Sequence, residues 1–173
     1  SLKQTFLRRE LGLAAVMLAV IVPVWFVNPR ILGASNLTAL SMDAGLLTIV
    51  AAAQMLILLT RNIDLSVASV MGLSAYVAAA LMKFHPEMGA ASALAAAAGV
   101  GMVCGLINGL VVSRGGLPAI VVTLGTLSIF RGANSLLASG KQISADQVPA
   151  SWLDMTAQPL AGVPALAWIA IGI

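Results

Sequence analysis

The sequence predicts an all-α, polytopic transmembrane helical bundle, and two features carry that prediction. Of the 173 residues, 60% are hydrophobic and only 9% are charged, whereas a soluble globular domain carries roughly a quarter charged residues. The charges also lie between long uncharged runs, at 11–27, 44–60, 65–82, 88–113 and 115–130. Each run is close to the ~20 residues that cross a bilayer as a helix.

These runs predict five membrane-spanning helices in a single transmembrane domain, 1–173. Their expected bounds, in order, are about 11–28, 40–60, 64–83, 88–113 and 117–138. Segment 139–159 is expected to be an outer loop. A sixth helix is expected to start at about 160, and the sequence ends inside it, so we expect a truncated chain that forms the N-terminal part of a larger protein.

The positions of Lys and Arg predict that the N-terminus lies in the cytoplasm. In that orientation the inside segments hold Lys3, Arg8, Arg9, Arg61 and Arg114. The outside segments hold Arg30, Lys83, Lys141 and, depending on its depth, Arg131. Cytoplasmic segments of membrane proteins carry an excess of these residues.

The short connection between the second and third helices is the first candidate site. Asn62, Asp64 and Ser66 are all favoured at helix N-termini, and Ser66, Ser69 and Tyr76 share one arc of the following helix. Two interpretations are open. The segment is either a tight turn with a capped helix and an Arg61–Asp64 pair, or a helix break at depth that faces a water-filled path.

A stripe of small residues on the fourth helix predicts close helix packing. Gly101, Gly105 and Gly109 recur every four residues, and such spacing lets two helices approach closely in lipid. Asn108 lies beside the stripe, and we expect it to bond to a neighbouring helix. Cys104 is expected to be a small buried hydrophobic residue.

The fifth helix carries a polar arc. Thr123, Thr126, Arg131 and Asn134 fall within about 140° of a helical wheel. Such an arc should face protein or water, because an Arg at mid-bilayer costs roughly 3 kcal/mol. Arg131 is either a snorkelling or interhelical cation, or a cation that lines the outer mouth of a pathway.

Two of these segments resemble the signatures of one transporter family. Residues 62–73, NIDLSVASVMGL, resemble the GIDLSVGS signature of the ribose-type permeases of ATP-binding-cassette importers. Residues 118–126 and 130–132 resemble a second signature of that family, and the resemblance covers roughly 5–173. The chain departs at Arg61-Asn62, where many members have two glycines, and at Ala68, where Gly is usual. These variants look closest to the rhamnose or autoinducer branch.

The resemblance implies a transport subunit of a bacterial inner membrane, with the 139–159 loop in the periplasm. It implies a second permease subunit in a homo- or heterodimer, cytoplasmic ATP-binding subunits and a periplasmic sugar-binding protein. ATP would be used by the partner ATPase, and no cofactor is expected on this chain. The segment that couples to the ATPase is expected in the C-terminal half of the family, beyond these residues.

Other function classes find less support in the sequence. It lacks a Walker lysine loop and a His-Glu-x-x-His motif, and its one histidine, His85, lies in an outer loop where a solvated role is expected. No catalytic site, metal site or nucleic-acid partner is therefore expected. A secondary transporter or channel is the alternative, with Asp43 and Asp64 as candidate coupling carboxylates. The residues predicted to line a solute pathway are Asn62, Asp64, Ser66, Ser69, Tyr76, Thr123, Thr126, Arg131 and Asn134.

Overall fold

The computed structural model describes residues 2–157, 159–160 and 163–164, and it is almost entirely helical. The α-helices are α1 (Leu2–Val27), α2 (Ala34–Leu59), α3 (Val67–Phe84), α4 (Gly89–Gly115), α5 (Ala119–Ala138) and α6 (Ala150–Ala157). Short 3-10 helices are η1 (Pro29–Leu32), η2 (Pro86–Met88) and η3 (Ala145–Gln147), and two short strands are β1 (Pro159–Leu160) and β2 (Val163–Pro164). Helices α1 to α5 are each long and apolar enough to cross a membrane. The predicted helical bundle with five spans is confirmed for the described part of the chain.

The helix bounds differ from the expected ones mainly at the N-terminal ends. Helix α1 begins at Leu2 and α2 at Ala34, both earlier than expected, whereas α3 begins later, at Val67. Helix α1 ends just before Asn28, because the residue that precedes a proline is disfavoured in helical conformation. The expected outer loop, 139–159, contains η3 and α6.

The start of the expected sixth helix is not helical. Pro159 pairs with Pro164 and Leu160 with Val163 in a small antiparallel ladder. Since Val163 precedes a proline, extended backbone is favoured there. The rest of that predicted helix, at 161–162 and 165–173, lies outside the described residues.

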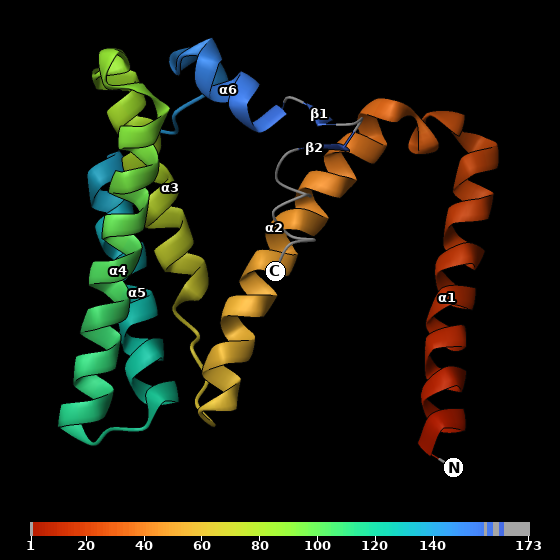
Figure 1. Ribbon diagram of the computed structural model, residues 1–173, viewed down its shortest axis with the longest axis horizontal. Helices are drawn as coiled ribbons and strands as arrows, with labels where there is room; N and C mark the ends of the chain where they lie inside the picture. Colours follow the sequence, from red (N-terminus) through yellow and green to blue (C-terminus); the bar gives the residue numbers. More distant parts are fainter. Residues whose placement is uncertain (1, 158, 161–162, 165–173) are drawn as a thin grey trace.

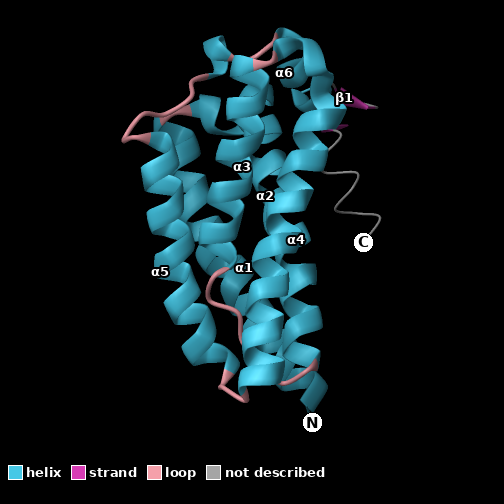
Figure 2. Cartoon of the chain, turned by 90° about the vertical axis from the view of Figure 1, so that its left-hand side faces the viewer, coloured by secondary structure: helices cyan, strands magenta, loops and turns pink. Residues whose placement is uncertain are grey.

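Figure 1 shows how the helices run. The N-terminus, the connection after α2 and the loop between α4 and α5 lie at one end, which we call the N-terminal end. Segments η1 and α6 and the turn between α3 and α4 lie at the opposite end, which we call the far end. Figure 2, turned by 90°, shows the long helices running lengthwise between the two ends. The predicted alternation of loops between two ends is therefore present, while the side of the membrane that each end faces stays a prediction.

The packed core lies between α3, α4 and α5. One cluster joins Leu73, Cys104 and Phe130, one from each helix, and a second joins Ala78, Met82 and Ala93. The predicted burial of Cys104 is confirmed, since it is 4% exposed. Helix α1 stands apart in Figure 1, and its apolar side chains from Leu11 onward are largely exposed. Such a surface suits lipid or further helices rather than water.

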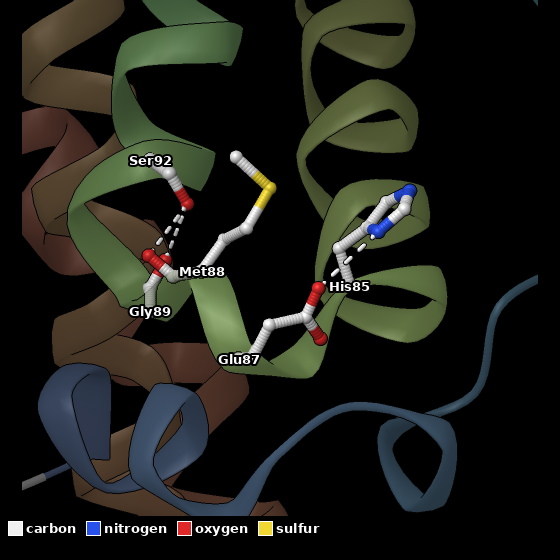
Figure 3. Close-up of polar contacts among 5 residues, drawn as sticks. All are labelled: His85, Glu87, Met88, Gly89 and Ser92. Carbon is white, nitrogen blue, oxygen red and sulfur yellow. Dashed lines mark hydrogen bonds and ion pairs between the residues drawn. The ribbon is translucent and has the colours of Figure 1, made fainter.

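The turn between α3 and α4 is held by local polar contacts (Figure 3). His85 Nδ1 lies 3.4 Å from Glu87 Oε1, and both side chains are more than half exposed. The Ser92 hydroxyl donates to the carbonyls of Met88 and Gly89 at 3.0 and 2.7 Å. The solvated position that the sequence predicted for His85 is confirmed.

Candidate functional site

The segment between α2 and α3 begins with a tight helix cap. The Asn62 N–H donates to the Ile57 carbonyl at 3.3 Å, and the Arg61 N–H donates to the Leu58 carbonyl at 2.9 Å. This pair of bonds is a Schellman motif, whose central residue takes a left-handed conformation. Arg61 occupies that position with φ of 59°. The motif explains why a glycine suits this position, although this chain has arginine.

After the cap the chain is non-helical, with a bend at Leu65, until α3 begins at Val67, well inside the bundle. The amide of Asn108, on α4, bonds to Ser66, the residue that precedes α3. Asn108 lies seven residues before Gly115, the end of α4, which is about 10 Å at 1.5 Å per residue. Figure 1 shows the non-helical segment between α2 and α3 rising from the end of α2 to the start of α3. This geometry favours the helix break over the tight turn.

A chain of hydrogen bonds fixes the start of α3. Asp64 Oδ1 accepts from both the Ser66 N–H and the Ser66 hydroxyl, each at 2.7 Å. The Ser66 oxygen in turn accepts from Asn108 Nδ2 at 2.8 Å. Ser66 is fully buried and Asn108 is 7% exposed. The expected bond from Asn108 to a neighbouring helix is therefore confirmed, and Asp64 supports the α3 N-terminus from two residues before the cap.

Two further side chains hold the break from the neighbouring helices. Gln54 Nε2, on α2, donates to the Asp64 carbonyl at 3.2 Å. Thr123 Oγ1, on α5, donates to the Ile63 carbonyl at 3.4 Å. Backbone groups that leave a helix inside a membrane protein need such partners. Gln54 was not among the predicted site residues, although it is the only amide side chain in the run 44–60.

The Arg61–Asp64 pair expected for the tight turn does not form. His85–Glu87 is the one ion pair within 4.0 Å in the part of the chain that the structure describes. Arg61 instead occupies the left-handed position of the α2 cap, and the Asp64 carboxylate accepts hydrogen bonds from Ser66. This element of the tight-turn interpretation was wrong.

A cavity of about 270 Å³ adjoins the break, and we call it the break cavity. Its polar lining comes from Thr60, Asn62, Asp64, Asn108 and Thr123, and the rest comes from Ile57, Ile63, Gly105, Gly109, Val112 and Ala119. The cavity thus lies where α2, the break, α4 and α5 meet.

The glycine stripe behaves differently along its length. A Cβ atom added at Gly101 would lie 3.9 Å from Ser74 Oγ on α3, which is ordinary contact. A Cβ at Gly105 or Gly109 would meet nothing within 4 Å among the described residues. The close approach predicted for these two glycines is therefore not found within the described chain, because both line the break cavity instead.

A second cavity, of about 380 Å³, lies between α3 and α5, and we call it the Arg131 cavity. Its lining residues are Ala68, Ser69, Gly72, Leu127, Arg131 and Asn134. Asn134 Oδ1 is buried without a hydrogen-bond partner in the described part of the chain. Gly72 and Asn134 also line a neighbouring cavity that contains Tyr76 and Lys141. Arg131 is exposed and lines this space, and its role as a snorkelling cation or as a cation at the mouth of a pathway stays a prediction.

Six of the nine predicted pathway residues line one of these two cavities. Asn62, Asp64 and Thr123 line the break cavity, and Ser69, Arg131 and Asn134 line the Arg131 cavity. The other three have local roles. Ser66 lies in the hydrogen-bond chain, Tyr76 donates to the Leu137 carbonyl at 3.3 Å, and Thr126 is buried. Whether these residues contact a transported solute stays a prediction.

Comparison with known proteins decides the family. Residues 36–171 match the family described as branched-chain amino acid transport system / permease component. This chain belongs to that permease family. The resemblance drawn from residues 62–73 and 118–132 is confirmed at the level of the family.

Curated relatives of this permease chain carry one recurrent name. It is 35% identical over 164 residues to the autoinducer 2 import system permease protein LsrC of Escherichia coli O157:H7, covering 95% of this chain and 46% of that protein. The same-named protein of Yersinia pseudotuberculosis serotype O:1b (strain IP 31758) is 37% identical over 134 residues, covering 78% and 37%. The chain thus spans about half the length of these relatives or less. No solved structure matches it significantly.

Proposed function

We propose that this chain is part of the transmembrane permease subunit of a bacterial ATP-binding-cassette importer that moves a sugar-like solute across the inner membrane. The solute would be rhamnose-like, ribose-like or autoinducer-like. The observation that carries the proposal is a family match to transport permeases in a chain whose signature segment, 62–73, forms a braced helix break beside a polar cavity.

The proposal assigns no catalytic chemistry to this chain. Its residues supply a path for the solute, and separate cytoplasmic subunits bind and hydrolyse ATP. A second permease subunit and a periplasmic sugar-binding protein complete the proposed assembly, in which lipid surrounds the helices. The N-terminal end would face the cytoplasm, in line with the excess of Lys and Arg there.

Copurification and reconstitution test this assignment. The full-length permease, expressed with the products of its neighbouring genes, is expected to copurify with an ATPase. In proteoliposomes the assembly is expected to take up sugar only with ATP and the binding protein. Uptake by the permease alone, driven by an ion gradient, would instead establish a secondary transporter and overturn the proposal.

A further inference from the structure

The break cavity presents a carboxylate with spare hydrogen-bonding capacity. Asp64 Oδ1 accepts both bonds from Ser66. Its other oxygen accepts no hydrogen bond and forms no ion pair within the residues that the structure describes. Asp64 is half-buried and lines the cavity. An ionisable group at such depth in a membrane protein usually has a functional partner.

Asn108 adds a second acceptor, and its orientation follows from its neighbours. The single Ser66 hydroxyl proton goes to Asp64, which accepts as a carboxylate, so the Ser66 oxygen must accept from Asn108 Nδ2. The Asn108 carbonyl oxygen is then left buried with no partner among the residues that the structure describes. Since Asn108 is more than nine-tenths buried and lines the cavity, this orphaned acceptor points to an absent donor.

Two glycines give the cavity its room. Gly105 and Gly109 lie on the same face of α4 as each other, and neither has a neighbour within 4 Å of a Cβ position in the described chain. Side chains at these positions would enter the space beside Asp64 and Asn108.

We propose that the break cavity binds neutral, hydroxyl-rich solutes, with the free oxygen of Asp64 and the carbonyl of Asn108 accepting hydrogen bonds from solute hydroxyls. Hydroxyl groups donate to both acceptors, whereas an anionic solute is repelled by the carboxylate. A bound metal ion fits less well, because the described residues hold no group of three His, Cys, Asp or Glu side chains that could ligate one. The proposal rests on the proposed transport function and assigns the class of solute and the acceptors that bind it.

Thiol labelling tests the charge and openness of the cavity without requiring transport. In the full-length permease complex in nanodiscs, with Cys104→Ser as background, a Gly109→Cys variant is treated with a cationic and an anionic methanethiosulfonate reagent. The modification rate with each reagent is divided by the rate of the same reagent with a free thiol, so that the two reagents can be compared. We expect the cationic reagent to be favoured about tenfold, as a nearby unpaired carboxylate dictates, and Asp64→Asn to remove that preference. Absence of modification, which means that a helix covers the glycine, or equal rates would overturn the proposal.

Protection from labelling tests the solute class. Ribose and rhamnose are expected to slow modification of Gly109→Cys at least about fivefold at saturation, whereas gluconate, an anionic sugar acid, is expected to leave it unchanged. Protection by gluconate as strong as that by the neutral sugars, or no protection by any of them, would overturn the assignment.

A matched pair of glycine substitutions on α4 tests the cavity without changing Asp64 or Ser66 at the start of α3. Gly105→Val fills the cavity and is expected to abolish protection, with the fold intact. Gly99→Val is the control, since Gly99 also lies on α4 with no described residue within 4 Å of its Cβ position but lines an apolar cavity. Loss of folding in Gly105→Val alone would show helix packing at Gly105 and overturn the proposal. Absence of ATP-dependent uptake by the wild-type complex would instead overturn the proposed function, while the labelling result would stand.

Discussion

The break cavity and the Arg131 cavity differ in how their polar groups are held. At the break cavity, Asp64 and Asn108 are both bonded to Ser66 at 2.7–2.8 Å. At the Arg131 cavity, Arg131 forms no ion pair in the described chain, and Asn134 Oδ1 has no partner. The break cavity therefore combines a fixed helix start with an anionic lining. The Arg131 cavity presents a cation and an amide oxygen that have no ion pair or hydrogen bond within the described chain. Among the described residues, Asp64 and Asn108 thus both hold the start of α3 and line a cavity.

The strongest test of this difference is removal of the break carboxylate. Asp64→Ala deletes two charge-assisted bonds at the start of α3, so we expect the free energy of unfolding to fall by about 2–3 kcal/mol and transport to fall with it. Glu87→Ala is the control, because the one ion pair that Glu87 forms within the described residues is with exposed His85 at the far end. Thermal unfolding and uptake of the two full-length variants are compared. Wild-type-like behaviour of both would remove the structural and functional importance of the break.

The two asparagines should respond in opposite directions to the same substitution. Asn108→Leu removes the bond to Ser66 together with a buried oxygen that has no partner in the described chain, so it is expected to destabilise the fold by about 1 kcal/mol. Asn134→Leu removes a buried unpaired oxygen and no hydrogen bond that the structure shows, so it is expected to stabilise by up to about 1 kcal/mol.

Chemical denaturation of both leucine variants measures these shifts, and uptake measures their functional cost. Asn134→Leu is expected to lower uptake despite its greater stability, as a pathway residue should. If Asn134→Leu lowers both uptake and stability, Asn134 has a structural partner that the described chain does not contain.

The sequence predicted the spans well and the cavities poorly, for a physical reason. Uncharged runs determine which residues can enter lipid, so five helices and the grouping of their loops could be deduced from charge positions alone. The division of Thr123 and Asn134 between two cavities could not be deduced in this way, because it depends on where α3 starts. The non-helical stretch before Val67 sets the position of α3 along its neighbours and thereby which side chains meet.

The glycine stripe illustrates the same limit. A four-residue spacing shows that Gly101, Gly105 and Gly109 share a face, and small residues on one face usually indicate packing. The spacing cannot show that Ser74 lies opposite the first glycine and a cavity lies opposite the other two. Gly101 faces Ser74 on α3, whereas Gly105 and Gly109 face the cavity that Ile63 and Asp64 of the break also line.

The Arg131 cavity should show the reverse charge preference of the break cavity. A Ser69→Cys variant in the Cys104→Ser background places a thiol beside Arg131. We expect the anionic reagent to be favoured several-fold, less than the preference at Gly109→Cys because exposed Arg131 is screened by solvent. Arg131→Gln is expected to remove the preference, and raised salt to reduce it. A preference for the cationic reagent would show that the two cavities share one electrostatic character.

The smallest effect concerns the cap before the break. Arg61 has a left-handed φ of 59°, a conformation that costs a non-glycine residue about 1 kcal/mol. A glycine would avoid this cost but would make the unfolded chain more flexible, which lowers stability by a few tenths of a kcal/mol less than the strain relieved. Arg61→Gly is therefore expected to stabilise the permease by about 0.5 kcal/mol, whereas Arg61→Ala, which retains the strained conformation, should not. Ser139→Gly, at the left-handed cap of α5 with φ of 48°, provides the matched comparison at the far end. If glycine stabilises at 139 but destabilises at 61, the Arg61 side chain itself must hold something at the N-terminal end, and the break would then depend on a contact made by the guanidinium as well as on Asp64.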